Sequence, residues 1–446
     1  MNIILLSGGS GQRLWPLSSE SRAKQFLKVL RSPEGVAESM IQRVYRQLHE
    51  IASDSSFVVS TTNSQKETIL QQLGDCVGIA VEPERRDTFP AIALAAVYLA
   101  SERKCSMSET VIAMPVDVYA EEGYFQTLLK MDKAVQNGAA DIVLMGVRPT
   151  YPSMKYGYIL PEAERTSDLM RVSRFVEKPT VQKATELLDM GAFWNGGVFA
   201  FKMGYMVEIV RKYIEPKDYA YLQENYHKLR KISFDYEIVE ACQSIAMVPY
   251  YGMWKDLGTW NTLTDVMHDP YAGKTLCGEG IENTHIINEL DIPVVALGIK
   301  NAVIATGPDG ILVSDKIAST QLKEYVDRIK QRPMYEKRQW GSYKVLNYIT
   351  HKDGSKSLTK HLRILSGKHL SYQRHKMRDE IWTVIEGVGE LLLDGQIKRL
   401  KRGDVAYIGR ERMHSIRAVE DLHMIEVQLG EELSEEDIER FDWEWS

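Results

Sequence analysis

The sequence has few cysteines, no excess of basic charge and no long apolar segment. Its 446 residues include 4 cysteines, and their scattered positions lack the paired spacing of a zinc site or a disulfide framework. Lysine and arginine number 55 against 61 aspartate and glutamate residues, a net charge of −6, and no basic tract is long enough to follow a nucleic-acid backbone. No apolar run is long enough to cross a bilayer, and no basic segment precedes the short apolar run near the N-terminus. We therefore expect a cytoplasmic protein that binds neither nucleic acid nor membrane.

The first part of the chain, 1–265, has the pattern of an α/β domain. Helix-like stretches near 91–100 and 124–135 separate short apolar runs that favour strands. These runs are 3–6, 57–59, 111–114, 142–147 and 198–201. Strands separated by helices of this length imply crossover connections and a mainly parallel, Rossmann-like sheet. In such sheets, ligands bind beyond the carboxyl ends of the strands.

Two further parts follow. In 266–335, short β-like pieces precede a helix expected over about 318–331, which suggests a linker with a few coils of a β-solenoid. In 336–446, β-like runs are punctuated by glycine at the spacing of a small all-β barrel. We expect the acidic end, 431–446, to close with a short helix.

The apolar run 3–6 ends in a glycine-rich turn, with the basic residues Arg13 and Lys24 close behind. The turn is Ser7-Gly8-Gly9-Ser10-Gly11-Gln12-Arg13. Backbone N–H groups of such a turn can surround a phosphate chain, and the two cations can neutralise it. The spacing is not that of a dinucleotide fold, and the turn contains no Gly-Lys-Ser/Thr that would make it a P-loop. An ordinary strand and turn is the alternative, which Arg13 and Lys24 disfavour.

Two aspartates have positions suited to a divalent cation. Asp117 follows an apolar run, and Asp256 lies in a distant segment, Trp254-Lys255-Asp256-Leu257-Gly258-Thr259-Trp260. Mg²⁺ needs only one or two protein carboxylates besides phosphate and water oxygens. A helix cap is the alternative for either aspartate alone. We expect Asp117 and Asp256 to hold Mg²⁺ together.

These strings, with four more, resemble the sugar-1-phosphate nucleotidyltransferases and in particular the bacterial mannose-1-phosphate guanylyltransferases. The four are Glu82-Pro83-Glu84-Arg85-Arg86-Asp87-Thr88, Tyr156-Gly157-Tyr158-Ile159, Phe175-Val176-Glu177-Lys178-Pro179 and Trp194-Asn195-Gly196-Gly197-Val198-Phe199. They occur in the family's order. Asp87 stands where the family has Asn, which leaves its contact open, and a solvated charged turn is sufficient to explain Glu84 and Arg85.

The resemblance implies a GT-A-like domain that transfers GMP from GTP to mannose 1-phosphate with Mg²⁺ and without a covalent intermediate. It places nucleotide contacts at Ser7, Gly8, Gly9, Gly11, Arg13, Glu82 and Arg86, sugar-phosphate contacts at Gly157, Glu177, Lys178 and Asn195, and catalytic charges at Arg13, Lys24, Lys178, Asp117 and Asp256. A pyrophosphorylase for another sugar 1-phosphate, such as one that makes a GDP-heptose, is an alternative. A sugar-nucleotide sensor without turnover is another.

The last part of the chain has the pattern of a metal-binding cupin barrel. Its candidate ligands are Gln373, His375, Glu380 and His414, and such nitrogen and oxygen donors suit a divalent transition metal, namely Zn, Mn, Co or Ni. This part resembles the type II mannose-6-phosphate isomerase domain that is fused to many guanylyltransferases. Ile381 and Ser415 stand where that domain commonly has His and Arg, so an active isomerase and a structural or dimerising barrel are both open. We expect a homo-oligomer, namely a dimer.

Overall fold

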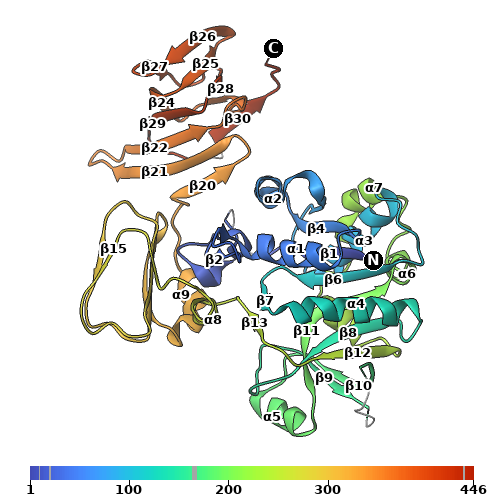
Figure 1. Ribbon diagram of the computed structural model, residues 1–446. Helices are drawn as coiled ribbons and strands as arrows, with labels where there is room; N and C mark the ends of the chain where they lie inside the picture. Colours follow the sequence, from blue (N-terminus) through green and yellow to red (C-terminus); the bar gives the residue numbers. More distant parts are fainter. Residues whose placement is uncertain (10, 20–21, 163–167, 435–436, 446) are drawn as a thin grey trace. The chain divides into compact units, whose positions relative to one another are not determined.

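The computed structural model describes residues 1–9, 11–19, 22–162, 168–434 and 437–445. The chain forms two compact units (Figure 1). One consists of Met1–Leu14 and Ala23–Asp269, and the other of Trp15–Arg22 and Pro270–Ser446. Among the helices in the described ranges, none combines the length and the apolar character needed to span a membrane.

A nine-stranded sheet forms the centre of the first unit (Figure 1). Its order is β5 (Gly78–Glu82), β4 (Ser56–Thr62), β1 (Asn2–Leu6), β6 (Thr110–Pro115), β11 (Phe193–Lys202), β8 (Ile142–Val147), β12 (Ile245–Tyr250), β10 (Met170–Val176) and β9 (Tyr158–Pro161). The first four strands are parallel. Beyond β6 the sheet is mixed, because β11 runs antiparallel to both β6 and β8. The predicted α/β fold is confirmed, and the parallel half carries the glycine-rich turn.

Helices cover both faces of this sheet. One face packs against α1 (Met40–Ile51), α2 (Lys66–Leu73), α4 (Glu122–Gln136) and α5 (Val181–Asp189), and the other against α3 (Thr88–Ser101), α6 (Met203–Arg211) and α7 (Tyr219–Glu224). Side chains alternate between the faces along each strand, so Ile3 and Leu5 belong to the first core and Ile4 to the second. The shorter elements are β2 (Leu30–Arg31), β3 (Ala37–Glu38) and α8 (Trp260–Thr264).

A short antiparallel ladder brings the two predicted magnesium ligands together. It pairs β7 (Val118–Ala120) with β13 (Trp254–Asp256), so that Asp256 lies opposite Val118. The Leu257 N–H donates to the Asp117 carbonyl oxygen over 3.0 Å. Asp117 therefore lies beside Asp256, although the two are far apart in the sequence.

The second unit begins with short parallel strands stacked in register. Tyr271 of β14 (Tyr271–Ala272) pairs with Ile286 of β16 (His285–Asn288), which pairs with Ile304 of β18 (Ala302–Gly307). A second stack consists of β15 (Thr275–Cys277) and β17 (Val294–Ala296), and β19 (Gly310–Asp315) adds an antiparallel strand to the first. This stacking is that of a short β-solenoid, as predicted.

The helix expected over 318–331 is shorter than predicted. It consists of a 3₁₀ turn at Ala318–Gln321 and α9 (Leu322–Val326). Within α9 only Leu322 is buried. A longer helix would gain little from packing, and short helices are marginal without it.

Two sheets form the all-β barrel at the end of the chain, which confirms that prediction. The first has the order β20 (Tyr335–Arg338), β21 (Gly341–Thr350), β22 (Lys356–Ile364), β29 (Leu422–Gly430), β24 (Arg378–Glu386) and β27 (Val405–Ile408); the second has β26 (Gln396–Lys401), β25 (Val388–Leu393), β28 (His414–Ala418), β23 (Tyr372–His375) and β30 (Ile438–Phe441). The expected C-terminal helix is wrong for the described residues there. They form β30, which pairs with β23 and so satisfies backbone groups of that strand.

Candidate functional site

A cavity of about 490 Å³ lies at the carboxyl ends of the parallel strands in the first unit. Ser7, Gly8 and Gly9 of the turn line one part of it, and Glu82 adjoins them. The predicted sugar-phosphate residues, Gly157, Glu177, Lys178 and Asn195, also line this cavity. Residues predicted for two ligands therefore share one cavity.

The glycine-rich turn is fixed by hydrogen bonds to neighbouring segments. The Ser7 N–H donates to the Ser60 carbonyl oxygen over 2.9 Å, and Gln25 Nε2 donates to the Ser7 carbonyl oxygen over 2.8 Å. Gly11 has a φ of 68°, a conformation that favours glycine. A Cβ atom added to Gly9 would meet no atom of the described residues within 4 Å. The turn is therefore held in place with open space over Gly9.

Glu82 lies beside this turn with its side chain buried. Its Oε2 accepts a hydrogen bond from the Tyr226 hydroxyl over 2.8 Å. Burial raises the pKa of Glu82 to about 7. Near neutral pH this carboxyl group therefore carries a proton for much of the time, which lessens its repulsion of an anion in the cavity.

Some residues of the charged segment that follows β5 line the cavity, and others contact the rest of the first unit. Arg85 and Asp87 line the cavity, and Asp87 caps α3 with a φ of 72°. Arg86, predicted to bind nucleotide, donates its Nε to the Leu229 carbonyl oxygen over 3.1 Å and pairs with Glu84 over 2.7 Å. Arg86 is thus held outside the cavity lining. Arg85, for which the sequence needed no role beyond a solvated turn, lines the cavity.

The sugar-phosphate residues form a close group. A Cβ atom on Gly157 would overlap Oε2 of Glu177 and crowd the ring of Phe175, so a larger residue would displace these side chains. That Oε2 is buried without a hydrogen-bond partner among the described residues, while Oε1 lies 3.0 Å from Lys178 Nζ. Burial by itself lowers the pKa of Lys178, but its hydrogen bond to Glu177 produces a net rise. Lys178 is therefore a stable cation, and Glu177 offers an unused acceptor to a ligand.

Asp117, Asp256 and Lys24 form a second group, on the β7–β13 ladder. The Lys24 ammonium contacts Asp117 and lies 3.9 Å from Asp256 Oδ1. Burial alone would raise the pKa of Asp117, but the charge of Lys24 lowers it overall. Burial, and then the charge of Asp117, raise the pKa of Asp256. The exposed Arg13 is close enough to lower the pKa of both aspartates.

This donor set fits Mg²⁺. The carboxylates of Asp117 and Asp256 meet at one end of this ladder, and burial first, then the charge of Asp117, raises the pKa of Asp256 although Lys24 is near. Mg²⁺ prefers oxygen ligands and binds through one or two carboxylates together with substrate phosphates. Asp117 and Asp256 would be the residues that hold it.

In the second unit, His375, Glu380 and His414 form a buried cluster of the kind that holds a metal ion. Nε2 of His375 lies 3.2 Å from Nε2 of His414 and 3.1 Å from Oε1 of Glu380. The Nδ1 atoms of the two rings lie 3.2 Å and 2.9 Å from the carbonyl oxygens of Arg378 and Arg412. Donation from each Nδ1 leaves each Nε2 with a lone pair. Two nitrogen lone pairs and a carboxylate therefore converge, which fits a divalent transition metal.

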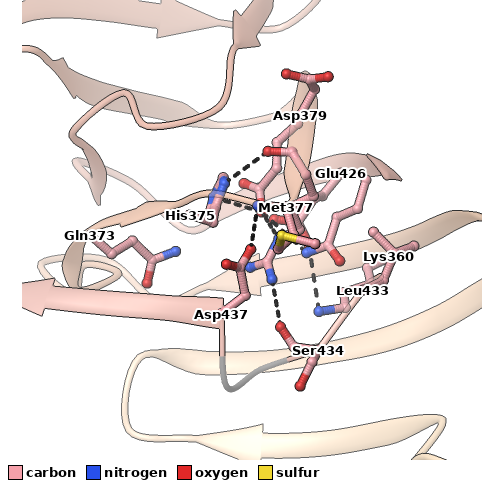
Figure 2. Close-up of polar contacts among 12 residues, drawn as sticks. Lys360, Gln373, His375, Met377, Asp379, Glu426, Leu433, Ser434 and Asp437 are labelled. Carbon is pink, nitrogen blue, oxygen red and sulfur yellow. Dashed lines mark hydrogen bonds and ion pairs between the residues drawn. The ribbon is translucent and has the colours of Figure 1, made fainter. Parts of the chain in front are cut away.

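Gln373, the fourth predicted ligand, is not bonded to this cluster. Its Oε1 accepts a hydrogen bond from the Ser371 hydroxyl over 2.7 Å. Figure 2 shows Gln373 beside His375, with no dashed line joining it to the other residues drawn. The two residues alternate with Arg374 on β23 and so share one face of the strand. Ligation by Gln373 stays a prediction.

A cavity of about 640 Å³ adjoins the metal-type cluster, with Gln373 and Glu380 in its lining. Lys360 and Glu426 also line it; they are cross-strand partners, with Nζ 3.8 Å from Oε2. Ser415, which stands where the isomerase domain commonly has Arg, is buried and donates its hydroxyl to the Leu370 carbonyl oxygen over 2.7 Å. That position therefore supplies no positive charge to the cavity.

Family models match both ends of the chain. A model described as nucleotidyl transferase matches residues 2–271. This chain belongs to the nucleotidyl transferase family. A second model, described as mannose-6-phosphate isomerase C-terminal, matches residues 327–443 of this nucleotidyl transferase. The first match includes the glycine-rich turn and both aspartates, and the second includes the metal-type cluster.

Relatives resemble this nucleotidyl transferase over nearly its full length. The xanthan biosynthesis protein XanB of Xanthomonas campestris pv. campestris (strain ATCC 33913) is 31% identical over 476 residues, covering 98% of this chain and 97% of the relative. The mannose-1-phosphate guanylyltransferase of Escherichia coli (strain K12) is 29% identical over 480 residues, with coverage of 98% and 97%. A crystal structure described as a mannose-1-phosphate geranyltransferase from Thermus thermophilus has a TM-score of 0.61 and 29% identity, and covers 74% of this chain and 99% of that one.

Two further cavity residues were missed by the sequence reasoning. Lys155 and Asp235 both line the cavity of the first unit. Lys155 directly precedes the string Tyr156-Gly157, so a basic residue two positions before a glycine of the site was a usable signal. Asp235 lies outside every string that carried the resemblance, and only the fold brings it to the cavity.

Proposed function

We propose that this protein transfers GMP from GTP to α-D-mannose 1-phosphate and releases GDP-mannose and pyrophosphate. The observation that carries the proposal is the cavity that joins a glycine-rich turn to a sugar-type group of donors and acceptors. The carboxylate pair with Lys24 lies outside its lining but close enough for the charge of Asp256 to act on Tyr156, which lines the cavity. The relatives named mannose-1-phosphate guanylyltransferases, which match over nearly the whole chain, support it.

The proposed reaction needs charge balance and alignment more than it needs a base. The phosphate oxygen of the sugar 1-phosphate is already anionic near neutral pH, and it attacks the α-phosphorus as pyrophosphate leaves. Lys178 and Arg13 offset the repulsion between the two anions, and the turn at Gly8 and Gly9 orients the triphosphate. Bound Mg²⁺ supplies charge neutralisation at the phosphates. Lys24, next to both aspartates, stabilises the charge that develops on the leaving group.

The remaining assignments are proposed with the function. Ser7, Gly8, Gly9, Gly11, Arg13 and Glu82 bind nucleotide, and Gly157, Glu177, Lys178 and Asn195 bind the sugar phosphate. Arg86, which is held outside the cavity lining, acts on the nucleotide only through the loop that carries Arg85. Because GTP is a cytoplasmic nucleotide, we place the reaction in the cytoplasm. We also propose that the protein is a homodimer. Light scattering of the full chain tests this, and the mass of a monomer would contradict it.

Pyrophosphate release tests the main proposal. We would measure it with each common nucleoside triphosphate against mannose 1-phosphate, glucose 1-phosphate and a heptose 1-phosphate. The proposal expects the highest kcat/KM for GTP with mannose 1-phosphate. Preference for another pair would indicate a different pyrophosphorylase, and tight binding of GDP-mannose without turnover would indicate a sensor.

The cupin barrel supports a second candidate activity, the interconversion of mannose 6-phosphate and fructose 6-phosphate. The converging Nε2 atoms of His375 and His414, next to a cavity with a buried Lys360–Glu426 pair, favour it over a purely structural barrel. A bound metal would polarise the substrate carbonyl. The test is a coupled isomerase assay on chain loaded in turn with Zn, Mn, Co or Ni. No activity with any metal would confine the function to the transferase.

We also propose the boundaries 1–265, 266–335 and 336–446 for the domains. Trp15–Arg22 belongs to the second unit, where Arg22 pairs with Glu289 of the solenoid. A truncated protein must therefore keep the solenoid, because this N-terminal segment packs with it. A chain that ends at Arg332 is therefore the appropriate variant, and it should still make GDP-mannose. Loss of the transferase activity would show that the barrel supports the first site.

A further inference from the structure

Asp235 is a cavity residue for which the proposed mechanism has no use. It is the first residue of a π-helical turn, Asp235–Val239, a rare conformation that often occurs at functional sites. The preceding residue, Phe234, is fully buried and packs on Phe199 and Phe201, with ring centroids 4.6 Å and 5.8 Å away. The aromatic anchor fixes the backbone at Asp235, whose side chain is partly exposed and lines the cavity.

Asp235 holds the side chain of Asn195. Nδ2 of Asn195 donates to Oδ1 of Asp235 over 2.6 Å, and Oδ1 of Asn195 accepts from the Gly197 N–H over 3.1 Å. An amide nitrogen carries two hydrogens. With one directed to Asp235 and the oxygen fixed by Gly197, the orientation of the amide is determined and its second N–H can serve a ligand.

The acceptors around this N–H are carboxylates. Glu177 Oε2 is buried with no hydrogen-bond partner in the described parts of the chain, and Asp235 lies close enough for the charge of Glu177 to act on it. Burial first, and then that charge, raise the pKa of Asp235 to about 7. The group thus offers one N–H donor and two carboxyl acceptors, which is the complement of a neutral polyol, because each hydroxyl donates one hydrogen bond and accepts others.

We infer that Asp235 is a sugar-binding residue of the transferase site: its carboxyl group fixes the Asn195 amide and accepts a hydrogen bond from a sugar hydroxyl next to the one bound by Glu177. The inference rests on the proposed function and assigns a specificity residue to it. Two acidic groups at this end of the cavity also disfavour sugars with a second negative charge, such as uronic acid 1-phosphates.

The test separates the two substrates kinetically. Asp235→Ala should raise the KM for mannose 1-phosphate about tenfold or more, because a hydrogen bond to the sugar is lost and Asn195 is released. The KM for GTP should stay within about twofold. Asp235→Asn keeps an acceptor oxygen and should recover part of the affinity. Glu240→Gln, at an exposed position just after the same π-helical turn, is the matched control and should behave as the unmodified protein.

A binding measurement and a double-mutant cycle complete the test. Calorimetry with mannose 1-phosphate should show the same loss for Asp235→Ala without turnover. Asn195→Ala and Asp235→Ala should be strongly non-additive, because the second change removes what positions the first residue. Equal effects on both substrates, or full additivity, would overturn the inference. An inactive unmodified protein would instead overturn the proposed function.

Discussion

The two candidate sites are built in opposite ways. In the first unit, the functional groups lie at the ends of strands or on loops just beyond them, and the Lys24 ammonium lies next to both carboxylates, Asp117 and Asp256. In the barrel, His375, Glu380 and His414 lie on the strands themselves and face one another directly, with the Nε2 atoms 3.1 Å and 3.7 Å from the carboxylate oxygens. The site of the first unit is suited to anionic substrates that arrive with their own cation, whereas the barrel site is suited to a metal ion that stays bound.

The largest expected effect comes from removing a carboxylate from the site of the first unit. Asp117→Asn and Asp256→Asn should each reduce transferase kcat about a thousandfold, because each takes one negative charge from the proposed magnesium site. Turnover at limiting Mg²⁺ is the measurement, and circular dichroism checks the fold. Near-normal turnover in both variants would contradict the assignment of Asp117 and Asp256.

Lys24→Ala should have the next largest effect. If the ammonium stabilises the departing pyrophosphate, the change should remove about 2–4 kcal/mol of transition-state stabilisation. The loss should appear in kcat. Lys28→Ala, the next lysine along the chain, is the control. An effect confined to the KM for GTP would assign Lys24 to ground-state binding instead.

The sequence predicted some residues of the candidate sites and missed others. The strings that carry Glu177 and Asn195 indicated the cavity, and those that carry Asp117 and Asp256 indicated the separate carboxylate pair, because each string matches a motif of the family that the sequence resembles. Which of two adjacent arginines faces the cavity was not predictable, since Arg85 and Arg86 differ only in how the loop turns and in the contact of Arg86 with Leu229. Asp235 could not be found either, because its position depends on the packing of Phe234. The resemblance to the cupin motif indicated Gln373 and His375 as ligands of one metal, and the alternation of side chains along β23 puts both on one face.

Glu82→Gln should stabilise the empty protein at high pH. The folded-state pKa of about 7 lies above the ordinary value of 4.5, so the folded state binds more protons between these values and its stability falls as the pH rises through them. Glutamine does not titrate, so the variant should avoid a loss of up to about 3 kcal/mol above pH 7. Chemical unfolding at low and high pH measures this, with Glu84→Gln as the exposed control. An equal effect at both pH values would contradict the buried, proton-holding state of Glu82.

The smallest expected effect sharpens the comparison between the two sites. His375→Ala with His414→Ala should remove the barrel's metal and any isomerase activity, and leave the transferase kcat within about twofold, because the sites share no ligand. Metal content by mass spectrometry and both assays on the same preparation are needed. A large loss of transferase activity would show that the barrel metal supports the first unit.

The central claim is that the cavity of the first unit joins GTP to mannose 1-phosphate. The most direct measurement is the phosphorus NMR spectrum of the full chain with Mg²⁺ and both substrates. The account predicts resonances of GDP-mannose and pyrophosphate that grow in equal amounts, and their absence in the Asp256→Asn variant. Unchanged substrate resonances with the unmodified chain, or equal growth with the variant, would contradict it.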